Sequence, residues 1–262
     1  MSEQSRAEEL ADTVANVLSD VLEERLIAVY LHGSAVLGGF RWDRSDLDVL
    51  AVMEGSLSDA EVEEVVAGLA PLQYPGNGLE MSILTLAEAR DPHRPAPLFQ
   101  LHLGTEGWDR RLKVVDGRAR DGDPDLVLHL LVCLAAGAAV IGPAPAAVLA
   151  APPVDAVRGA VLEEIRWSLA NDPPPEYVAL TAARAWCYLA TGRVASKGEA
   201  GHWAMDQVAP RSDAAAVLAA AVARQAGAQR GPTREQAQVF ARDVLALLDG
   251  EGTPGRALDL SR

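Results

Sequence analysis

The hydrophobic pattern of the N-terminal half is typical of a sheet. Residues 26–31 (LIAVYL) form a short apolar run, whereas residues 46–53 (DLDVLAVM) and 79–86 (LEMSILTL) alternate between two kinds of side chain. Apolar or alternating runs of this length favour strands. We therefore expect three strands here, with residues 99–103 forming the last strand of the sheet.

Helical spacing surrounds these strands. Residues 3–24 place apolar side chains at intervals of three and four, which predicts an amphipathic helix packed beside the first strand. A second helix is expected from Ser58, with Glu61 completing a capping box, up to the residue before Pro71. Residues 126–140 are apolar on all sides, so we expect a helix buried between layers.

A proline-rich segment separates the two halves of the chain. Residues 141–153 (IGPAPAAVLAAPP) contain four prolines in thirteen residues, and helical patterns dominate beyond them. We therefore predict an α+β domain with a mixed sheet over residues 1–148 and an all-α helical bundle over residues 149–262. Five helices are expected in the bundle, at residues 155–170, 176–191, 197–208, 213–225 and 233–248.

The composition narrows the class of protein. The chain has 262 residues, of which 49% are hydrophobic, so it can bury a large core. No apolar run approaches the ~20 residues of a membrane span, and the polar N-terminus is unlike a signal peptide, so we expect a cytoplasmic protein without membrane contacts. Cys133 and Cys187 are expected to be reduced core residues, and no cysteine–histidine spacing indicates zinc. His129, in an apolar run, is expected to be a hydrogen-bonded core histidine.

The formal net charge of −14 changes the list of partners. Nucleic-acid binding without sequence preference needs a basic surface, so this charge argues against nucleic acid as a partner. An acidic surface would speed the approach of a cationic substrate, but it is also an ordinary route to solubility.

The candidate chemistry begins with Asp46 and Asp48. Residues two apart in a strand leave the same face, so two carboxylates lie side by side and repel unless a cation lies between them. Hard carboxylate oxygens, with phosphate as the remaining ligands, suit magnesium. Upstream, Gly33 and Ser34 follow the first strand, where backbone amides and a hydroxyl could bind a phosphate. An isolated pair of this kind is more often a solvated strand edge than a metal site.

The stretch GSAVLGGFRWDRSDLDVLAV, residues 33–52, resembles the glycine-serine and Asp-x-Asp signature of polymerase-beta-like nucleotidyltransferases. It is most similar to the aminoglycoside (3'')(9)-adenylyltransferases, which modify streptomycin and spectinomycin. A second block, ALTAARAWCYLATGRVASKGEAGHWAMDQV, is similar to the helical domain of the same family. The resemblance implies transfer of AMP from ATP to a hydroxyl of an aminocyclitol or aminoglycoside, with release of pyrophosphate and resistance to the antibiotic.

The resemblance also implies roles for individual residues. Asp46 and Asp48 would bind one or two Mg²⁺ ions, and Glu80, on the third strand, matches the position of the family's general base. In the family, the residues at the positions of Arg184 and Lys197 contact the phosphates of the nucleotide. Gly33 and Ser34 would also bind these phosphates. On its own, each of these residues could equally be an ordinary surface or strand residue.

The drug-binding residues match the family less closely. Streptomycin-modifying members carry a tryptophan after the base strand, where this chain has His102, with Trp108 six residues on. They also carry acidic residues in the loop between the first two bundle helices, where Asp172 and Glu176 are the candidates here. We add Trp167 and Tyr177 as candidate substrate-binding residues. The missing determinants favour spectinomycin over streptomycin.

Two other functions stay open at this stage. One is a nucleotidyltransferase that adenylylates a protein or another small alcohol. The other is a ligand-binding regulator on a scaffold that has lost its activity, which the retention of all three carboxylates and the serine argues against. The expected state is a monomer, with ATP and the small-molecule acceptor as partners.

Overall fold

The computed structural model describes residues 2–92, 96–106 and 111–250. The chain divides into two compact units, residues 1–157 and residues 158–262. The division lies inside helix α7 (Val154–Asn171), beyond the boundary at residues 148/149 that the proline-rich segment indicates. Each unit is described by itself.

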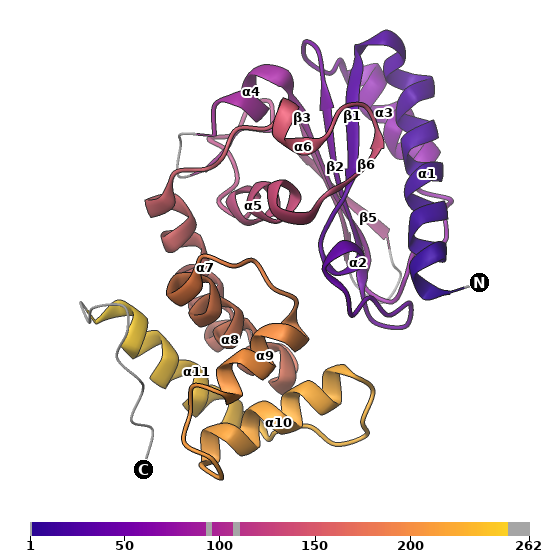
Figure 1. Ribbon diagram of the computed structural model, residues 1–262. Helices are drawn as coiled ribbons and strands as arrows, with labels where there is room; N and C mark the ends of the chain where they lie inside the picture. Colours follow the sequence, from indigo (N-terminus) through magenta and orange to yellow (C-terminus); the bar gives the residue numbers. More distant parts are fainter. Residues whose placement is uncertain (1, 93–95, 107–110, 251–262) are drawn as a thin grey trace. The chain divides into compact units, whose positions relative to one another are not determined.

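Unit 1 is built on one mixed sheet (Figure 1). In the described part of the chain its strand order is β5-β4-β3-β2-β1-β6, and only β2 and β3 run parallel. The predicted mixed sheet is therefore confirmed. The strands are β1 (Leu26–Leu31), β2 (Asp46–Met53), β3 (Gly78–Thr85), β4 (Leu101–Glu106), β5 (Arg111–Asp116) and β6 (Ala138–Ile141).

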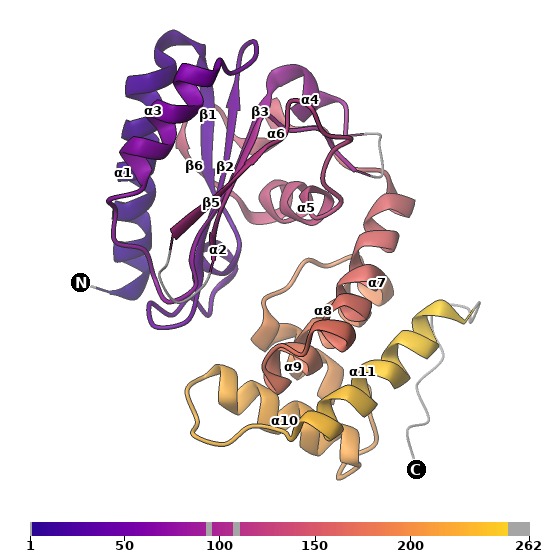
Figure 2. The same cartoon turned by 180° about the vertical axis from the view of Figure 1, so that it is seen from behind.

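Helices cover both faces of this sheet (Figures 1 and 2). Helices α1 (Glu3–Leu22) and α3 (Asp59–Leu69) lie on one face, and the predicted capping box of Ser58 and Glu61 begins α3. On the other face lie α4 (Leu86–Arg90), α5 (Leu126–Ala136) and α6 (Pro145–Val148). The short 3₁₀ helix η1 (Glu23–Arg25) precedes β1, and the short helix α2 (Ser34–Leu37) follows it.

The alternation of β2 divides the core into two layers. One buried cluster contains Leu47, Val49 and Ala51 together with residues of α1 and α3. The other contains Leu50 and Val52 with residues of α5 and α6. Since side chains alternate along a strand, Asp46 and Asp48 leave the sheet on the α5 side, as the pattern predicts.

Two expectations for unit 1 were wrong. The strand predicted at residues 99–103 is β4, but it is not the last, because β5 and β6 follow it and form the two edges of the sheet. The helix predicted over residues 126–140 ends at Ala136, and its last residues form β6, which pairs with β1. Gly137 ends the helix in an extended conformation, so tertiary pairing decides the structure of the apolar residues beyond it.

Helix α5 was expected to be buried between two layers, but in its own unit it packs on the sheet with one side only. Leu126, Leu130 and Cys133 pack on the sheet, whereas Ala135 is exposed. An apolar composition on all sides therefore did not predict burial on all sides.

Unit 2 is the predicted helical bundle. Helix α8 is its centre and packs against α9, α10 and α11. Gly192 ends α8 in the left-handed conformation expected of a C-terminal cap. The helices that follow α7 are α8 (Pro175–Thr191), α9 (Lys197–Met205), α10 (Asp213–Gln225) and α11 (Arg234–Asp249). Within the described ranges, every helix falls short of the length and apolar character that crossing a membrane requires.

Candidate active site

The parallel pairing of β2 with β3 brings three carboxylates together. Asp48 lies opposite Glu80, and Asp46 lies opposite Gly78, so the acidic side chains occupy adjacent positions on one face of the sheet. Carboxylate oxygens of Asp46, Asp48 and Glu80 all lie within 4.8 Å of one another. We call these three residues the carboxylate cluster. Such closely spaced like charges are stabilised by a cation, and an all-oxygen set suits Mg²⁺.

The turn after β1 closes around this cluster. Gly33 has a φ of +64°, and a Cβ added there would lie 1.8 Å from Oδ2 of Asp48, so only glycine leaves room for the carboxylate. The backbone N–H of His32 donates to the carbonyl oxygen of Asp48 at 3.0 Å, which ties the turn to β2. The hydroxyl oxygen of Ser34 is buried and has no hydrogen-bond partner among the described residues. A ligand at this turn would satisfy that hydroxyl.

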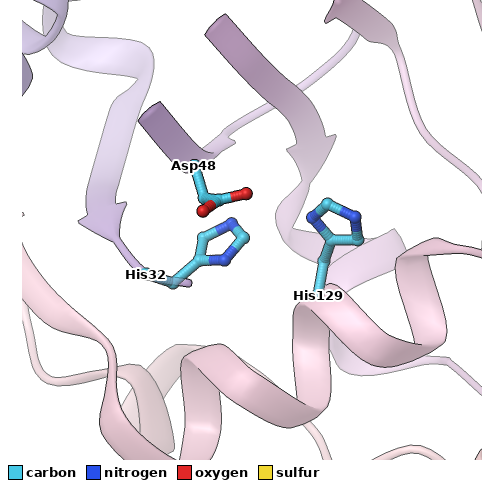
Figure 3. Close-up of side chains that lie close together, drawn as sticks. All are labelled: His32, Asp48 and His129. Carbon is cyan, nitrogen blue, oxygen red and sulfur yellow. The ribbon is translucent and has the colours of Figure 1, made fainter. Parts of the chain in front are cut away.

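Two histidines that the sequence analysis did not assign to the site lie beside Asp48 (Figure 3). The rings of His32, at the end of β1, and His129, on α5, are 5.2 Å apart and nearly perpendicular. Nε2 of His129 lies 3.5 Å from Oε1 of Glu80, so the histidine expected in the core borders the carboxylate cluster. The position of His32 directly before Gly33 was the one signal in the sequence. Nothing local marks His129, because only the packing of α5 on the sheet brings it here.

Burial controls the charge of the histidines next to the cluster. The pKa of His32 is lowered well below its usual 6.5, first because the ring is buried and second because His129 is close. His102 on β4 lies opposite Ser82, whose hydroxyl is 3.0 Å from its Nδ1. Burial also lowers the pKa of His102, against the opposing effect of Glu80. His102 thus lies on the face of the carboxylate cluster, whereas Trp108 falls outside the described residues.

A second polar group lies in unit 2, where α8 and α9 pack together. The ammonium group of Lys197 lies 4.1 Å from the ring centroid of Tyr177. The hydroxyl of Tyr177 donates to Oε1 of Glu164 at 2.5 Å, and its ring is 6.3 Å from that of Trp167. The structure therefore brings Lys197, Tyr177 and Trp167 into one group. The Ser196 side chain caps α9 at the residue before Lys197.

The face of α8 continues this group. Thr181 and Arg184 follow Tyr177 by four and seven residues, which places all three on one face of the helix. The hydroxyl of Thr181 is buried without a hydrogen-bond partner in the described part of the chain. Arg184 is half-buried, and within the described residues no ion pair to it is found. A cation and an unsatisfied hydroxyl on one face are suited to an anion.

The acidic candidates of unit 2 are held differently. Asp172 forms an ion pair with Arg234, and Glu176 lies 3.5 Å from Nε of Arg224. Both acids therefore already contact arginines of their own unit.

Comparison with known proteins finds similar adenylyltransferases. Residues 141–246 match the family described as aminoglycoside adenylyltransferase, C-terminal domain. The spectinomycin 9-adenylyltransferase of Staphylococcus aureus is 29% identical over 200 residues, which cover 72% of this chain and 74% of the relative. The aminoglycoside (3'')(9) adenylyltransferase of Klebsiella pneumoniae is 29% identical over 209 residues, covering 74% and 77%. The chain is therefore similar to these adenylyltransferases over 72% to 74% of its length, and its C-terminal part matches the family model.

A solved structure supports the fold of this chain. The crystal structure of a spectinomycin adenyltransferase from Enterococcus faecialis with ATP and spectinomycin superposes with a TM-score of 0.71 at 20% identity. The match covers 92% of this chain and 98% of the other. The predicted architecture, a mixed-sheet unit followed by a helical unit, is therefore confirmed.

The candidate residues form two kinds of group. Unit 1 offers clustered oxygen ligands, an unsatisfied serine hydroxyl and a carboxylate, Glu80, on the strand next to them. Unit 2 offers Lys197 and Arg184 on packed helices. The first set suits a metal-bound phosphate and a proton acceptor, and the second suits the negative charge of a polyphosphate.

Proposed function

We propose that the protein transfers AMP from ATP to a hydroxyl of an aminocyclitol or aminoglycoside antibiotic, with spectinomycin as the favoured acceptor, and releases pyrophosphate. One observation carries the proposal: three carboxylates on adjacent strands lie within 4.8 Å of one another, beside the turn at Gly33 and Ser34. The names of the relatives, which include a spectinomycin 9-adenylyltransferase, supply the acceptor.

Asp46 and Asp48 would hold one or two Mg²⁺ ions. The fit rests on the oxygen-only donor set of the carboxylate cluster and on the space that Gly33 leaves for the Asp48 carboxylate. Bound magnesium would neutralise part of the charge of the triphosphate and make its α-phosphorus more electrophilic. The buried hydroxyl of Ser34 would donate to a phosphate oxygen.

Glu80 would accept the proton of the acceptor hydroxyl. The hydroxyl oxygen forms a bond to the α-phosphorus while the bond from that phosphorus to the pyrophosphate oxygen breaks. Glu80 is the third member of the cluster and also lies beside His129, so an imidazole is within reach of the carboxylate that takes up the proton. Arg184 and Lys197 would contact the phosphates and stabilise the leaving pyrophosphate.

The acceptor site is proposed to involve His102, Tyr177 and Trp167. Asp172 and Glu176 are less available, because each contacts an arginine. Trp108 stays a candidate from the sequence. Streptomycin-modifying enzymes are expected to bind the drug through acidic residues in the loop between the first two bundle helices. Here the acids of that loop contact Arg234 and Arg224 instead, which supports spectinomycin as the favoured drug. We further propose a cytoplasmic monomer that does not bind nucleic acid.

The test is a transfer assay with a panel of acceptors. Full-length protein is incubated with Mg²⁺ and ATP together with spectinomycin, streptomycin or neither, while pyrophosphate is measured and the drug is analysed by mass spectrometry. We expect an AMP adduct on spectinomycin and none with the Asp48→Asn variant. Transfer to a co-expressed protein but to no drug would favour the protein-modifying alternative. Ligand binding without any transfer, unchanged in Asp48→Asn, would favour a regulator.

A further inference from the structure

The two histidines beside Asp48 form a cluster of different chemistry. One ligand atom each of His32, Asp48 and His129 lies within 4.8 Å of the other two. The residues come from the position directly after β1, from β2 and from α5, and Figure 3 shows both rings next to the Asp48 carboxylate. The three side chains therefore meet through the fold, with two nitrogen donors and one oxygen donor.

An unsatisfied atom indicates that this cluster has a ligand. His32 is only 2% exposed, and its Nε2 is buried without a hydrogen-bond partner in the described ranges. A buried polar atom that lacks a partner costs about 1–3 kcal/mol, so native structures nearly always satisfy it with a protein group, water or ion. A metal ion bound by the imidazole would remove this penalty.

We propose that His32, Asp48 and His129 form a second metal site, which takes Zn²⁺ or a neighbouring divalent ion such as Co²⁺ in preference to Mg²⁺. Imidazole nitrogen suits zinc and its neighbours, whereas Mg²⁺ prefers oxygen ligands in octahedral geometry. Three protein ligands of this kind leave a position open for water or a substrate oxygen. Glu80, 3.5 Å from His129, is near enough to fix the orientation of that ring.

Asp48 links this site to the carboxylate cluster. Asp48 belongs to both sets of ligands. A zinc ion bound to His32 and His129 would therefore occupy the Asp48 carboxylate, which the carboxylate cluster needs to bind Mg²⁺. Zinc should therefore inhibit magnesium-dependent transfer, and this consequence rests on the proposed function. Binding of Zn²⁺ by itself does not depend on the proposed function, so the zinc site and the proposed function can fail separately.

The experiment measures metal binding without nucleotide or drug. Metal-free, full-length protein is titrated with Zn²⁺ by calorimetry in the presence of excess Mg²⁺, and with Co²⁺ by absorption spectroscopy. We expect one equivalent of Zn²⁺ to bind, and His129→Gln to weaken this binding by more than about 100-fold. Asp46→Asn removes a residue of the carboxylate cluster alone and should bind Zn²⁺ like the wild type. His202→Gln removes an exposed histidine of unit 2 and is the matched control.

Two results would overturn the site. One is a wild-type protein that takes up no stoichiometric Zn²⁺ under these conditions. The other is unchanged binding in His129→Gln. X-ray absorption at the zinc edge of the wild-type complex covers the case of a variant that fails to fold: a shell with two imidazoles supports the site, and an oxygen-only shell contradicts it.

Discussion

Two groups of acidic side chains, one in each unit, are held in opposite ways. In unit 2, Asp172 and Glu176 each lie against an arginine of the same unit. In unit 1, Asp46, Asp48 and Glu80 are held within 4.8 Å of one another instead. Acids spread over ion pairs need no further partner, whereas acids gathered at one point favour a cation from outside the chain. Under the proposed function, this difference separates the acids that maintain the fold from the acids that bind a ligand.

The largest effect should follow from removing one charge of the carboxylate cluster. Asp48→Asn keeps the shape of the side chain but takes away a proposed metal ligand, so we expect transfer to fall by about 1000-fold or more. The melting temperature should stay the same or rise, because the repulsion among the three carboxylates is relieved. Parallel turnover and thermal unfolding measurements check this. A large loss of stability would show that the cluster maintains the fold, as the pairs of unit 2 do.

A matched pair of glycine substitutions sharpens the same contrast. Gly33→Ala adds a Cβ 1.8 Å from Oδ2 of Asp48 at a φ of +64°, so the carboxylate must move and the backbone is strained. Gly192→Ala has a similar φ of +71° but meets no atom within 4 Å. Both should lose about 1 kcal/mol of stability from backbone strain.

Only Gly33→Ala should also lose transfer, by about 100-fold, because a reacting group displaced by about 1 Å has that effect. Denaturant unfolding and turnover of both variants test this expectation. Equal turnover in the two would mean that the position of the Asp48 carboxylate does not matter to the reaction.

The pH dependence of stability should report the burial of His32. Its folded pKa lies below the unfolded value of 6.5, so below that pH the unfolded state binds more protons and the free energy of unfolding falls. The slope for one such group approaches about 1.4 kcal/mol per pH unit. His102, whose pKa is also lowered, adds to the loss in the same direction.

Urea unfolding of the wild type and of His32→Asn at about pH 7.5 and about pH 5.5 measures this slope. We expect a smaller fall in the variant. An equal fall in both proteins would mean that the burial of His32 does not cause the loss of stability at low pH.

The smallest effect should come from an ion pair of unit 2. Arg166 and Asp249 lie 2.8 Å apart, with side chains 44% and 42% exposed. Arg166→Ala should therefore lower the free energy of unfolding by no more than about 1 kcal/mol and leave transfer unchanged. A turnover defect in this variant would mean that an acid in an ion pair of unit 2 also affects the reaction.

Local patterns predicted much of the fold. The alternation of residues 46–53 predicted which face Asp46 and Asp48 share, and helical spacing predicted the bundle. Both patterns depend on neighbours in the sequence. The strand pattern placed Glu80 on a third strand and the family resemblance gave it a role, but only the parallel pairing of β2 and β3 shows that it lies opposite Asp48.

The parts that were not predicted depend on distant contacts. The apolar residues 138–141 form β6 because β1 offers an edge to pair with, which no local pattern records. His32 and His129 are brought together by the packing of α5 on the sheet, and no spacing rule for metal ligands covers such a separation. The roles of the site residues stay predictions until they are tested.

Glu80 gives the most direct test of the central claim, that the carboxylate cluster performs adenylyl transfer. Turnover with spectinomycin and the dissociation constant for ATP with magnesium are measured side by side in the wild type and in Glu80→Gln. We expect a loss of transfer of about 100-fold to 10,000-fold, with ATP affinity nearly unchanged, because the proposed base acts on the acceptor hydroxyl. Transfer that persists in Glu80→Gln would contradict the account, and a collapse of ATP affinity would make Glu80 a metal ligand instead.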